Sequence, residues 1–202
     1  MKVVLASRNQ GKIKEFNAYL HELGWQVIGV EQFADVPEVV EDGKTFADNA
    51  IKKAREVMLA TKMPAFADDS GIVVEALGGR PGVYSARYAG EGATDQENNR
   101  KLLGEMQDVP DDQRQAKFVC YIAFITPKNP EQPELYIGEC HGYLLREPRG
   151  EGGFGYDPLF YLPEEGKTMA EVTMERKNQI SHRANALKKM CESRKSNGLF
   201  FD

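Results

Sequence analysis

The sequence predicts a mixed α/β or α+β fold, in which strands and helices interleave at both ends of the chain and a β-hairpin lies between them. Three observations support this prediction. An apolar run at the amino terminus leads into a helical pattern, two capping boxes mark further helices, and two long strands flank a turn rich in Pro and Asn. With 202 residues, the chain is long enough for one large domain or for two lobes that share one core.

The first elements follow from the spacing of apolar residues. Lys2–Ala6 is an apolar run typical of a buried strand. Apolar residues then recur at near-helical spacing from Ile13 to Leu23, and Gly24 stands where a helix would end. Trp25–Val30 is predicted to form a second strand.

Two capping boxes predict the next helices. Thr45 is followed by Asp48, and Thr94 is followed by Glu97. In each box the hydroxyl and the acid can satisfy the amide groups that a helix start leaves without partners. An apolar stripe at helical spacing follows each box, so we expect one helix after Thr45 and another after Thr94.

The remaining strands are predicted in the middle of the chain. Ala65–Ala67 is a short strand that leads into Asp68–Gly71, and Ile72–Leu77 continues as apolar chain. Ala116–Thr126 and Leu135–Arg146 are long runs that we expect to pair as antiparallel strands.

Composition narrows the classes of function. The net charge of −5 argues against a basic surface for duplex DNA or RNA, although a local cluster of cations can still bind a small anion. No apolar run approaches the ~20 residues that span a bilayer. The start lacks a secretory signal, so we expect a cytoplasmic protein. The three cysteines form no CxxC pair, and we expect free thiols rather than a zinc site or disulfides.

The first candidate site is the polar turn between the first strand and the first helix. Main-chain amides at a helix start attract phosphate, and a lysine adds a full charge. The turn is not a Walker A loop, and an ordinary polar connection is the structural alternative. Its residues are Ser7, Arg8, Asn9, Gln10, Gly11 and Lys12.

The second candidate is a pair of carboxylates, Asp68 and Asp69, in front of Ser70 and Gly71. Mg²⁺ prefers oxygen ligands, and one or two carboxylates usually hold it together with substrate phosphates. A carboxylate can alternatively take a proton from water. Successive side chains of a strand point in opposite directions, so only one of the pair needs to face a site. A solvated turn is the structural alternative.

An upstream acid is a third candidate. Glu38, Glu41 and Asp42 precede the second predicted helix, and one of them could complete a metal site beside the aspartate pair. Acids in such a position are more often simply exposed.

A glycine-rich segment is the fourth candidate. Three glycines surround Phe154 and are followed by Tyr156 and Asp157. Glycines allow a ligand to approach the main chain, and an aromatic face can stack on a base. Asp157 can accept a hydrogen bond from a base edge. A tight turn with a core aromatic is the structural alternative.

The fifth candidate lies near the carboxyl terminus. Ser181 can cap the last helix, which places His182 and Arg183 in its first turn, and Lys177 precedes them. Cations there oppose the helix dipole, which suggests that an anionic or polar ligand compensates them. Solvated surface charge is the alternative.

These segments closely resemble the inosine/xanthosine triphosphate pyrophosphatase family, and the resemblance extends from Lys2 to about Leu187. The matching motifs, in order, are SRNQGK, EDGKTFADNA, FADDSG, LGGRPGVYSARYAG, GGFGYDP and KNQISHRANAL. The family fold is an elongated mixed α/β structure of one domain, here residues 1–202, with two lobes around a central nucleotide-binding cleft. Members are commonly homodimers.

The resemblance implies roles for individual residues. Asp69 matches the catalytic proton acceptor and metal ligand, and Glu41 is the best match to the upstream ligand of Mg²⁺, although Glu38 lies near. Ser7 and Arg8 depart from the usual Thr-Gly or Thr-Ser, but Ser7 keeps the hydroxyl. The substrate-binding residues that the resemblance implies are Ser7, Arg8, Asn9, Gln10, Gly11, Lys12, Lys53, Ser70, Phe154, Gly155, Tyr156, Asp157, Lys177, His182 and Arg183.

The implied activity is Mg²⁺-dependent hydrolysis of ITP, dITP and XTP to the monophosphate and pyrophosphate. Selectivity would come from a donor for the purine O6 and an acceptor for N1–H, which leaves polar groups unpaired with adenine. His182 and Arg183 are candidate donors, and Asp157 is the candidate acceptor. Two alternatives stay open at this stage: a Maf-type pyrophosphatase acting on other modified nucleotides, and a non-enzymatic nucleotide-binding regulator.

Overall fold

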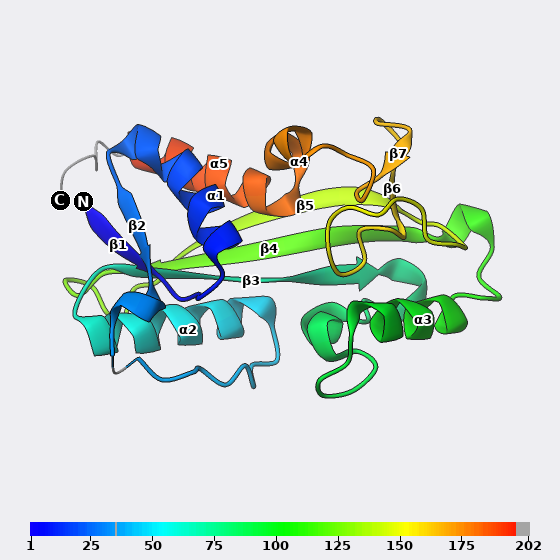
Figure 1. The fold of residues 1–202 in the computed structure, drawn as a ribbon. Coiled ribbons are helices and arrows are strands. Elements are labelled where there is room, and N and C mark those ends of the chain that lie inside the picture. The colour runs from blue at the N-terminus through cyan, green and yellow to red at the C-terminus, as the bar shows by residue number, and fades with distance from the viewer. Residues whose placement is uncertain (35, 197–202) are drawn as a thin grey trace. The chain divides into compact units, whose positions relative to one another are not determined.

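The computed structural model describes residues 1–34 and 36–196. It contains a seven-stranded mixed sheet with the strand order β2-β1-β3-β4-β5-β6-β7 (Figure 1). Strand β1 pairs in parallel with β2 and β3, whereas β6 pairs antiparallel with β5 and β7. The strands are β1 (Lys2–Leu5), β2 (Gln26–Gly29), β3 (Ala65–Val74), β4 (Gln115–Ile125), β5 (Glu134–Leu144), β6 (Phe160–Leu162) and β7 (Lys167–Thr168).

The helices fall between these strands. The α-helices are α1 (Gln10–Leu20), α2 (Phe46–Thr61), α3 (Asp95–Glu105), α4 (Met174–Ile180) and α5 (His182–Ser196). Short 3-10 helices occupy His21–Leu23, Val30–Gln32, Glu75–Leu77, Gly82–Arg87 and Asp111–Gln113. The chain divides into two compact units. Among the described residues, unit 1 comprises those within 1–69, 120–138 and 185–196, and unit 2 comprises residues 70–119 and 139–184.

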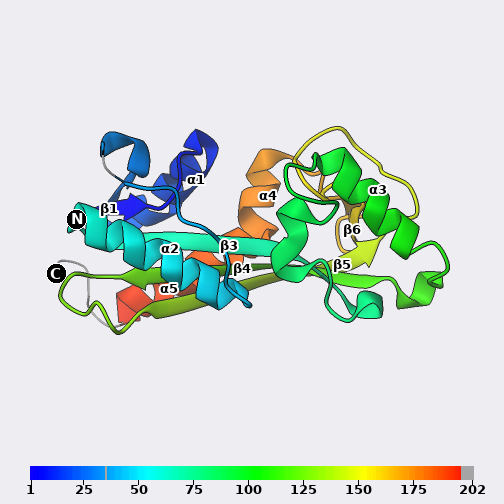
Figure 2. The same ribbon diagram turned by 90° about the horizontal axis from the view of Figure 1, so that it is seen from below.

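Unit 1 is a three-layer structure. Helices α1 and α5 cover one face of its part of the sheet and α2 covers the other, as the two views in Figures 1 and 2 show. The alternation of strand side chains explains the two layers of core, because Val3 and Leu5 of β1 pack with α1 and α5, whereas Val4 packs with α2. The ring centroids of Phe16 and Phe66 lie 4.9 Å apart in the first of these layers.

Unit 2 has one apolar core. Most of its buried side chains come from β3, α3, β4, β5, β6 and the segment before β6. The ring of Phe160 is fully buried and its centroid lies 4.4 Å from that of Phe118. The buried guanidinium of Arg114 donates to the carbonyl oxygens of Leu144 and Met106, which ties the chain after α3 to β5.

Most predicted elements are confirmed, with one correction in the middle of the chain. The predicted short strand Ala65–Ala67 is longer than expected, because β3 continues without interruption from Ala65 to Val74. The alternative of a solvated turn at Asp68–Gly71 is therefore wrong. The pattern had not predicted β6, β7 or α4. The side chains of Cys120, Cys140 and Cys191 are buried, and none of them forms a disulfide in the described part of the chain. None of the helices in residues 1–34 and 36–196 is long and apolar enough to cross a membrane.

Candidate active site

The turn between β1 and α1 is held by its own polar side chains. Asn9 caps α1, and its side-chain oxygen accepts hydrogen bonds from the amides of Gly11 (2.8 Å) and Lys12 (3.1 Å). The amide of Asn9 donates to the Ser7 hydroxyl at 3.1 Å. Arg8 donates to the carbonyl oxygen of Val36 at 3.3 Å. The turn therefore has a defined shape in which Asn9 takes the position that an anion could occupy at this helix start.

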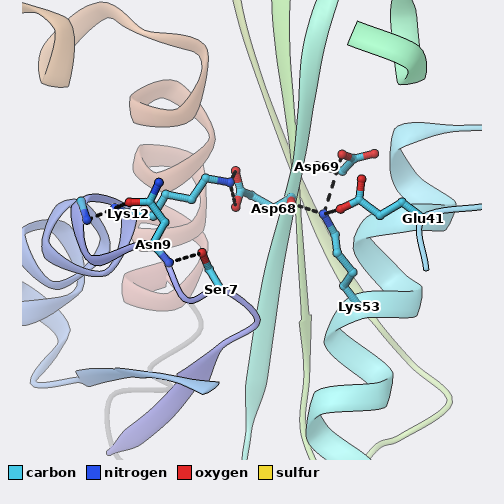
Figure 3. A network of polar contacts seen from close by, with 8 residues as sticks. Ser7, Asn9, Lys12, Glu41, Lys53, Asp68 and Asp69 are labelled. Carbon is cyan, nitrogen blue, oxygen red and sulfur yellow. Dashed lines mark hydrogen bonds and ion pairs between the residues drawn. The ribbon is translucent and has the colours of Figure 1, made fainter. Parts of the chain in front are cut away.

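Lys12 and Asp68 form an ion pair on the α1 face of β3. The Lys12 Nζ donates to the two carboxylate oxygens of Asp68 at 3.0 and 3.1 Å. The Asp68 side chain is 3% exposed, so a nearby cation is needed to stabilise its charge. This pair connects the first candidate loop to the aspartate motif (Figure 3).

Asp69 points to the opposite face of β3, where it joins Glu41 and Lys53 (Figure 3). Lys53 Nζ lies 2.5 Å from Glu41 Oε1 and 3.7 Å from Asp69 Oδ1, and it also donates to the Asp68 carbonyl oxygen at 2.8 Å. Helix α2 supplies Lys53, and the segment before α2 supplies Glu41. The alternation expected from the strand is confirmed, because the two aspartates serve opposite faces.

Burial and the neighbouring charges shift the pKa values of Asp69 and Lys53. Burial raises the pKa of the Asp69 carboxyl, and repulsion by Glu41 and Asp68 adds to the rise, while Lys53 and a hydrogen bond from Asn49 oppose it. Burial acts to lower the pKa of Lys53, but attraction by Asp68, Asp69 and Glu41 outweighs it, so that pKa is raised. Lys53 is therefore firmly charged, whereas Asp69 holds a proton at a higher pH than an ordinary aspartate.

A pocket of about 260 Å³ lies beside this cluster. Its polar lining consists of Ser7, Arg8, Glu38, Glu41 and Lys53. The structure thus brings Ser7 and Arg8, at the start of the first candidate loop, close to Glu41 and Lys53. Asp42, the third acid considered, instead forms an exposed ion pair with Lys52 at 2.7 Å.

The carboxylates Glu41 and Asp69 are suited to a hard cation. Both approach the same ammonium group, which shows that a positive charge is stable between them. Mg²⁺ needs only one or two carboxylates when substrate phosphates supply further oxygens. Within the described part of the chain, no group of three or more His, Cys, Asp and Glu side chains is arranged to hold a metal ion.

In unit 2, a buried ion pair supports the glycine-rich segment. Asp157 is 3% exposed, and its carboxylate accepts from Lys177 Nζ at 2.5 Å and from the Phe154 amide at 3.0 Å. Lys177 Nζ lies 4.5 Å from the centroid of the Phe154 ring, which is itself 60% exposed. Gly153 has φ +76°, and a Cβ there would lie 2.1 Å from the Asp157 carboxylate. The segment therefore presents an open aromatic face above a fixed charge pair.

Helix α3 holds the main chain on both sides of Gly155 in the same segment. Asp95 accepts from the Gly155 amide at 2.7 Å, and Asn99 donates to the Gly155 carbonyl oxygen at 2.9 Å. The Tyr156 ring is buried and its hydroxyl donates to the Ser85 carbonyl oxygen at 2.8 Å. Tyr156 thus anchors the segment in the core of unit 2. Phe154, in contrast, is exposed.

The start of α5 is buried rather than solvated, so the surface-charge alternative for His182 and Arg183 is wrong. His182 is 7% exposed and Arg183 is 6% exposed. The His182 ring stacks on Phe118 with centroids 5.0 Å apart. Ser181 accepts from the Ala184 amide at 3.2 Å, which confirms it as the cap of this helix. Burial of both residues at a helix start indicates a specific role for them.

Sequence reasoning had missed three polar residues that hold site residues in place. Asp95 and Asn99 fix the glycine-rich segment, as described above. Asn49 donates to Asp69 Oδ2 at 3.0 Å and is fully buried. A signal for Asn49 was present, because an asparagine occupied a position beside Ala50 on the apolar stripe of the second helix, where its amide requires hydrogen-bond partners.

Taken together, the fold and the side chains define a mixed α/β protein with a lysine-bridged carboxylate site on β3 and a supported aromatic segment in unit 2. The chain belongs to the Ham1 family, whose signature matches residues 3–193. The family match favours the resemblance drawn from the sequence over the Maf-type alternative.

Comparison with known proteins gives closely similar relatives. The chain is 53% identical to the dITP/XTP pyrophosphatase of Geobacter sulfurreducens over 186 residues, which are 92% of each chain. It is 50% identical to the dITP/XTP pyrophosphatase of Escherichia coli K12 over 192 residues, which are 95% of this chain and 97% of the relative. A solved HAM1 protein from Coxiella burnetii has a TM-score of 0.91 at 42% identity, covering 97% of this chain and 99% of that one.

Proposed function

We propose that this chain hydrolyses non-standard purine nucleoside triphosphates, namely ITP, dITP and XTP, to the monophosphate and pyrophosphate. Relatives named dITP/XTP pyrophosphatases match it at about 50% identity over nearly its whole length. The observation in the structure that carries the proposal is the Glu41–Lys53–Asp69 cluster, which joins a buried carboxylate to a cation beside a polar pocket. Hydrolysis would remove such nucleotides from the cellular pool.

In the proposed mechanism, Asp69 orients a water molecule and accepts its proton as the water attacks the α-phosphorus. The bond from the α-phosphorus to the bridging oxygen breaks, and pyrophosphate leaves. A carboxylate with a raised pKa is suited to this task because it is a stronger base than an ordinary aspartate. Phosphoryl chemistry depends chiefly on positioning and on stabilisation of charge, which the lysines of the site supply.

Phosphate binding is assigned to the cationic side chains and the first loop. Lys53 is held in the pocket that Ser7 and Arg8 also line, so these three residues are proposed to contact the triphosphate. Lys12 is proposed to contact it after exchanging part of its interaction with Asp68 for a phosphate oxygen. Asn9, Gln10 and Gly11 are proposed to contribute through the main-chain amides of the helix start.

Glu41 and Asp69 are proposed to hold Mg²⁺, which when bound supplies positive charge to the phosphates. Glu41 is preferred to Glu38, since Glu41 contacts the same ammonium group that lies near Asp69. Lys53 would then share its two carboxylates with the metal ion and turn toward phosphate.

Base recognition is assigned to unit 2. Phe154 is proposed to stack on the purine, because its ring is exposed while its main chain is fixed by Asp157. Lys177, His182 and Arg183 are proposed as donors to the purine, and Ser70, Gly155, Tyr156 and Asp157 as parts of the same subsite. Since Asp157 is already paired with Lys177, a role as acceptor for N1–H requires that pair to open or to share its oxygen.

Pyrophosphate release from ITP, measured with Mg²⁺ and with excess EDTA, tests the activity. We expect turnover with Mg²⁺ and its loss with EDTA; no turnover under either condition would instead favour a nucleotide-binding regulator. Values of kcat/KM for ITP, XTP, GTP and ATP test the base subsite, and equal values would contradict it. The proposed homodimer and cytoplasmic location stay predictions, the first of which light scattering will check.

A further inference from the structure

Asn49 is a buried amide next to the proposed catalytic carboxylate. It lies in the first turns of α2, one turn before Lys53, and is 0% exposed. Burying an amide is unfavourable unless its donors and acceptor are satisfied, so the partners of Asn49 indicate why it is there.

The two ends of the Asn49 side chain bind two different parts of the site. Its Nδ2 donates to Asp69 Oδ2 at 3.0 Å, and its Oδ1 accepts from the Gly43 amide at 2.8 Å. The orientation of the amide follows from these partners. A main-chain N–H can only donate and an ionised carboxylate can only accept, so the reversed amide would break both hydrogen bonds.

The contact with Asp69 distinguishes its two oxygens. Asn49 binds Oδ2, whereas Oδ1 is the oxygen that lies 3.7 Å from Lys53, the lysine that also contacts Glu41. A carboxylate held by one oxygen cannot rotate freely about its terminal bond. The hydrogen bond therefore fixes the direction of the oxygen that faces the cations.

The contact with Gly43 fixes the segment that carries Glu41. Gly43 lies two residues after Glu41, and a Cβ at Gly43 would lie 2.5 Å from Asn49 Oδ1 and 2.8 Å from the Asp48 Cβ. The main chain thus packs closely against the amide. The same side chain that orients Asp69 therefore also limits how far Glu41 can move from it.

We propose that Asn49 is a positioning residue that holds Asp69 and the Glu41 segment in a fixed mutual arrangement. The inference rests on the proposed function, since it assigns catalytic importance to Asp69 and Glu41. The role assigned to Asn49 is exerted through Asp69 and the Glu41 segment and not by contact with substrate. Loss of a partner that orients a metal-binding or catalytic side chain typically reduces metal affinity or activity by about 10–100-fold.

Two variants of Asn49 separate its two contacts. Asn49→Leu has similar size and loses both hydrogen bonds. Asn49→Asp keeps an acceptor for the Gly43 amide but loses the donor to Asp69, and it is assayed in alkaline buffer so that the two carboxyls do not share a proton. The matched control is Asn17→Ala. Asn17 likewise uses both ends of its amide, accepting from the Val27 amide and donating to the Val27 carbonyl oxygen at 2.9 Å each, but both of these partners are main chain.

Three measurements decide the proposal: kcat and KM for ITP, the Mg²⁺ concentration for half-maximal rate, and hydrogen exchange at the Gly43 amide. For Asn49→Leu we expect kcat to fall about 10–100-fold, more Mg²⁺ to be required, KM for ITP to change less than kcat, and Gly43 to exchange faster. Asn49→Asp should lose kcat while Gly43 stays protected. Asn17→Ala should lower Tm and leave kcat near the wild-type value.

Other outcomes would overturn the proposal. A kcat for Asn49→Leu within two-fold of the wild type contradicts the positioning role, as does a loss that Asn17→Ala reproduces. Retained kcat in Asn49→Asp contradicts the donor contact. If wild-type protein releases no pyrophosphate from ITP, the proposed function fails and with it the catalytic role of Asn49, whereas rapid exchange of Gly43 in an active wild type refutes the positioning of the Glu41 segment alone.

Discussion

Asp68 and Asp69 are adjacent in β3, yet their carboxylates point to opposite faces of the sheet and pair with different lysines, Lys12 and Lys53. The pleat of the strand produces this separation. Two neighbouring carboxylates thereby have different environments, and only Asp69 lies beside Glu41. Asp69 is thus the proposed catalytic acid, whereas Asp68 holds Lys12 in place.

Asp69→Asn should abolish most turnover, because the amide cannot accept the proton of the attacking water. We expect kcat to fall about 10²–10⁴-fold, the range typical of general acid–base catalysis. Asp68→Asn should reduce kcat less, since Asp68 acts through Lys12. Pyrophosphate release assays and thermal melts of both variants provide the comparison, and near-normal turnover by Asp69→Asn would refute the assigned role.

The raised pKa of Asp69 should appear in the pH dependence of stability. Burial is the main cause of the rise, so the folded protein binds this proton at a higher pH than the unfolded chain does. The contribution of Asp69 to the free energy of unfolding therefore decreases as pH rises from the ordinary value of 3.8 through the raised value. Over that window, Asp69→Asn should gain stability relative to the wild type. Urea unfolding at a series of pH values measures the difference, and a wild type that gains instead would contradict the shift.

Lys53→Met should destabilise the protein, because it leaves Glu41 and Asp69 without their shared cation. Removing one partner of a fully buried pair costs about 3–5 kcal/mol, and we expect less here since the Glu41 side chain is 36% exposed. The raised pKa of Lys53 means that its stabilising effect is fully present below the ordinary value of 10.5 and is lost as pH rises through the folded value. Free energies of unfolding at neutral and strongly alkaline pH test both statements. An unchanged midpoint at neutral pH would show that the ammonium contributes no net stability.

Phe154→Ala should weaken nucleotide binding with little effect on folding, because the ring is 60% exposed. Loss of base stacking is worth about 1–3 kcal/mol, or roughly 5–150-fold in kcat/KM for ITP. Tyr84→Ala is a matched control, since Tyr84 is an aromatic in the same unit with 57% exposure. Steady-state kinetics of both variants would reject the stacking role if they lose activity equally.

Much of the architecture could be predicted from local patterns. The capping boxes at Thr45 and Thr94 are present as predicted, because such signals act within one helical turn. The continuation of β3 through the aspartates could not be predicted locally. Charged residues in a buried strand require cations from other elements, and the sequence does not show that Lys12 and Lys53 lie on its two faces.

The sequence predicts which residues belong to the candidate site better than it predicts how those residues contact one another. Asp69, Glu41 and Lys53 do converge, but their mutual arrangement depends on Asn49, which resembles any polar residue inside a helix. Likewise, Phe154 stood out between glycines, whereas its support by Asp95 and Asn99 comes from a helix about 60 residues earlier in the chain. Interactions between residues this far apart cannot be derived from spacing.

Because side chains alternate along β3, the number of residues in this strand determines which face of the sheet each aspartate points to. Inserting or deleting one residue between Ala65 and Asp68 would rotate the following side chains by half a turn and exchange the two carboxylates between faces. Asp69 would then lie beside Lys12, and Asp68 would lie beside Lys53 and Asn49. The connections before and after the strand can change length without this effect, so we expect a change of length to be tolerated far better around β3 than within it.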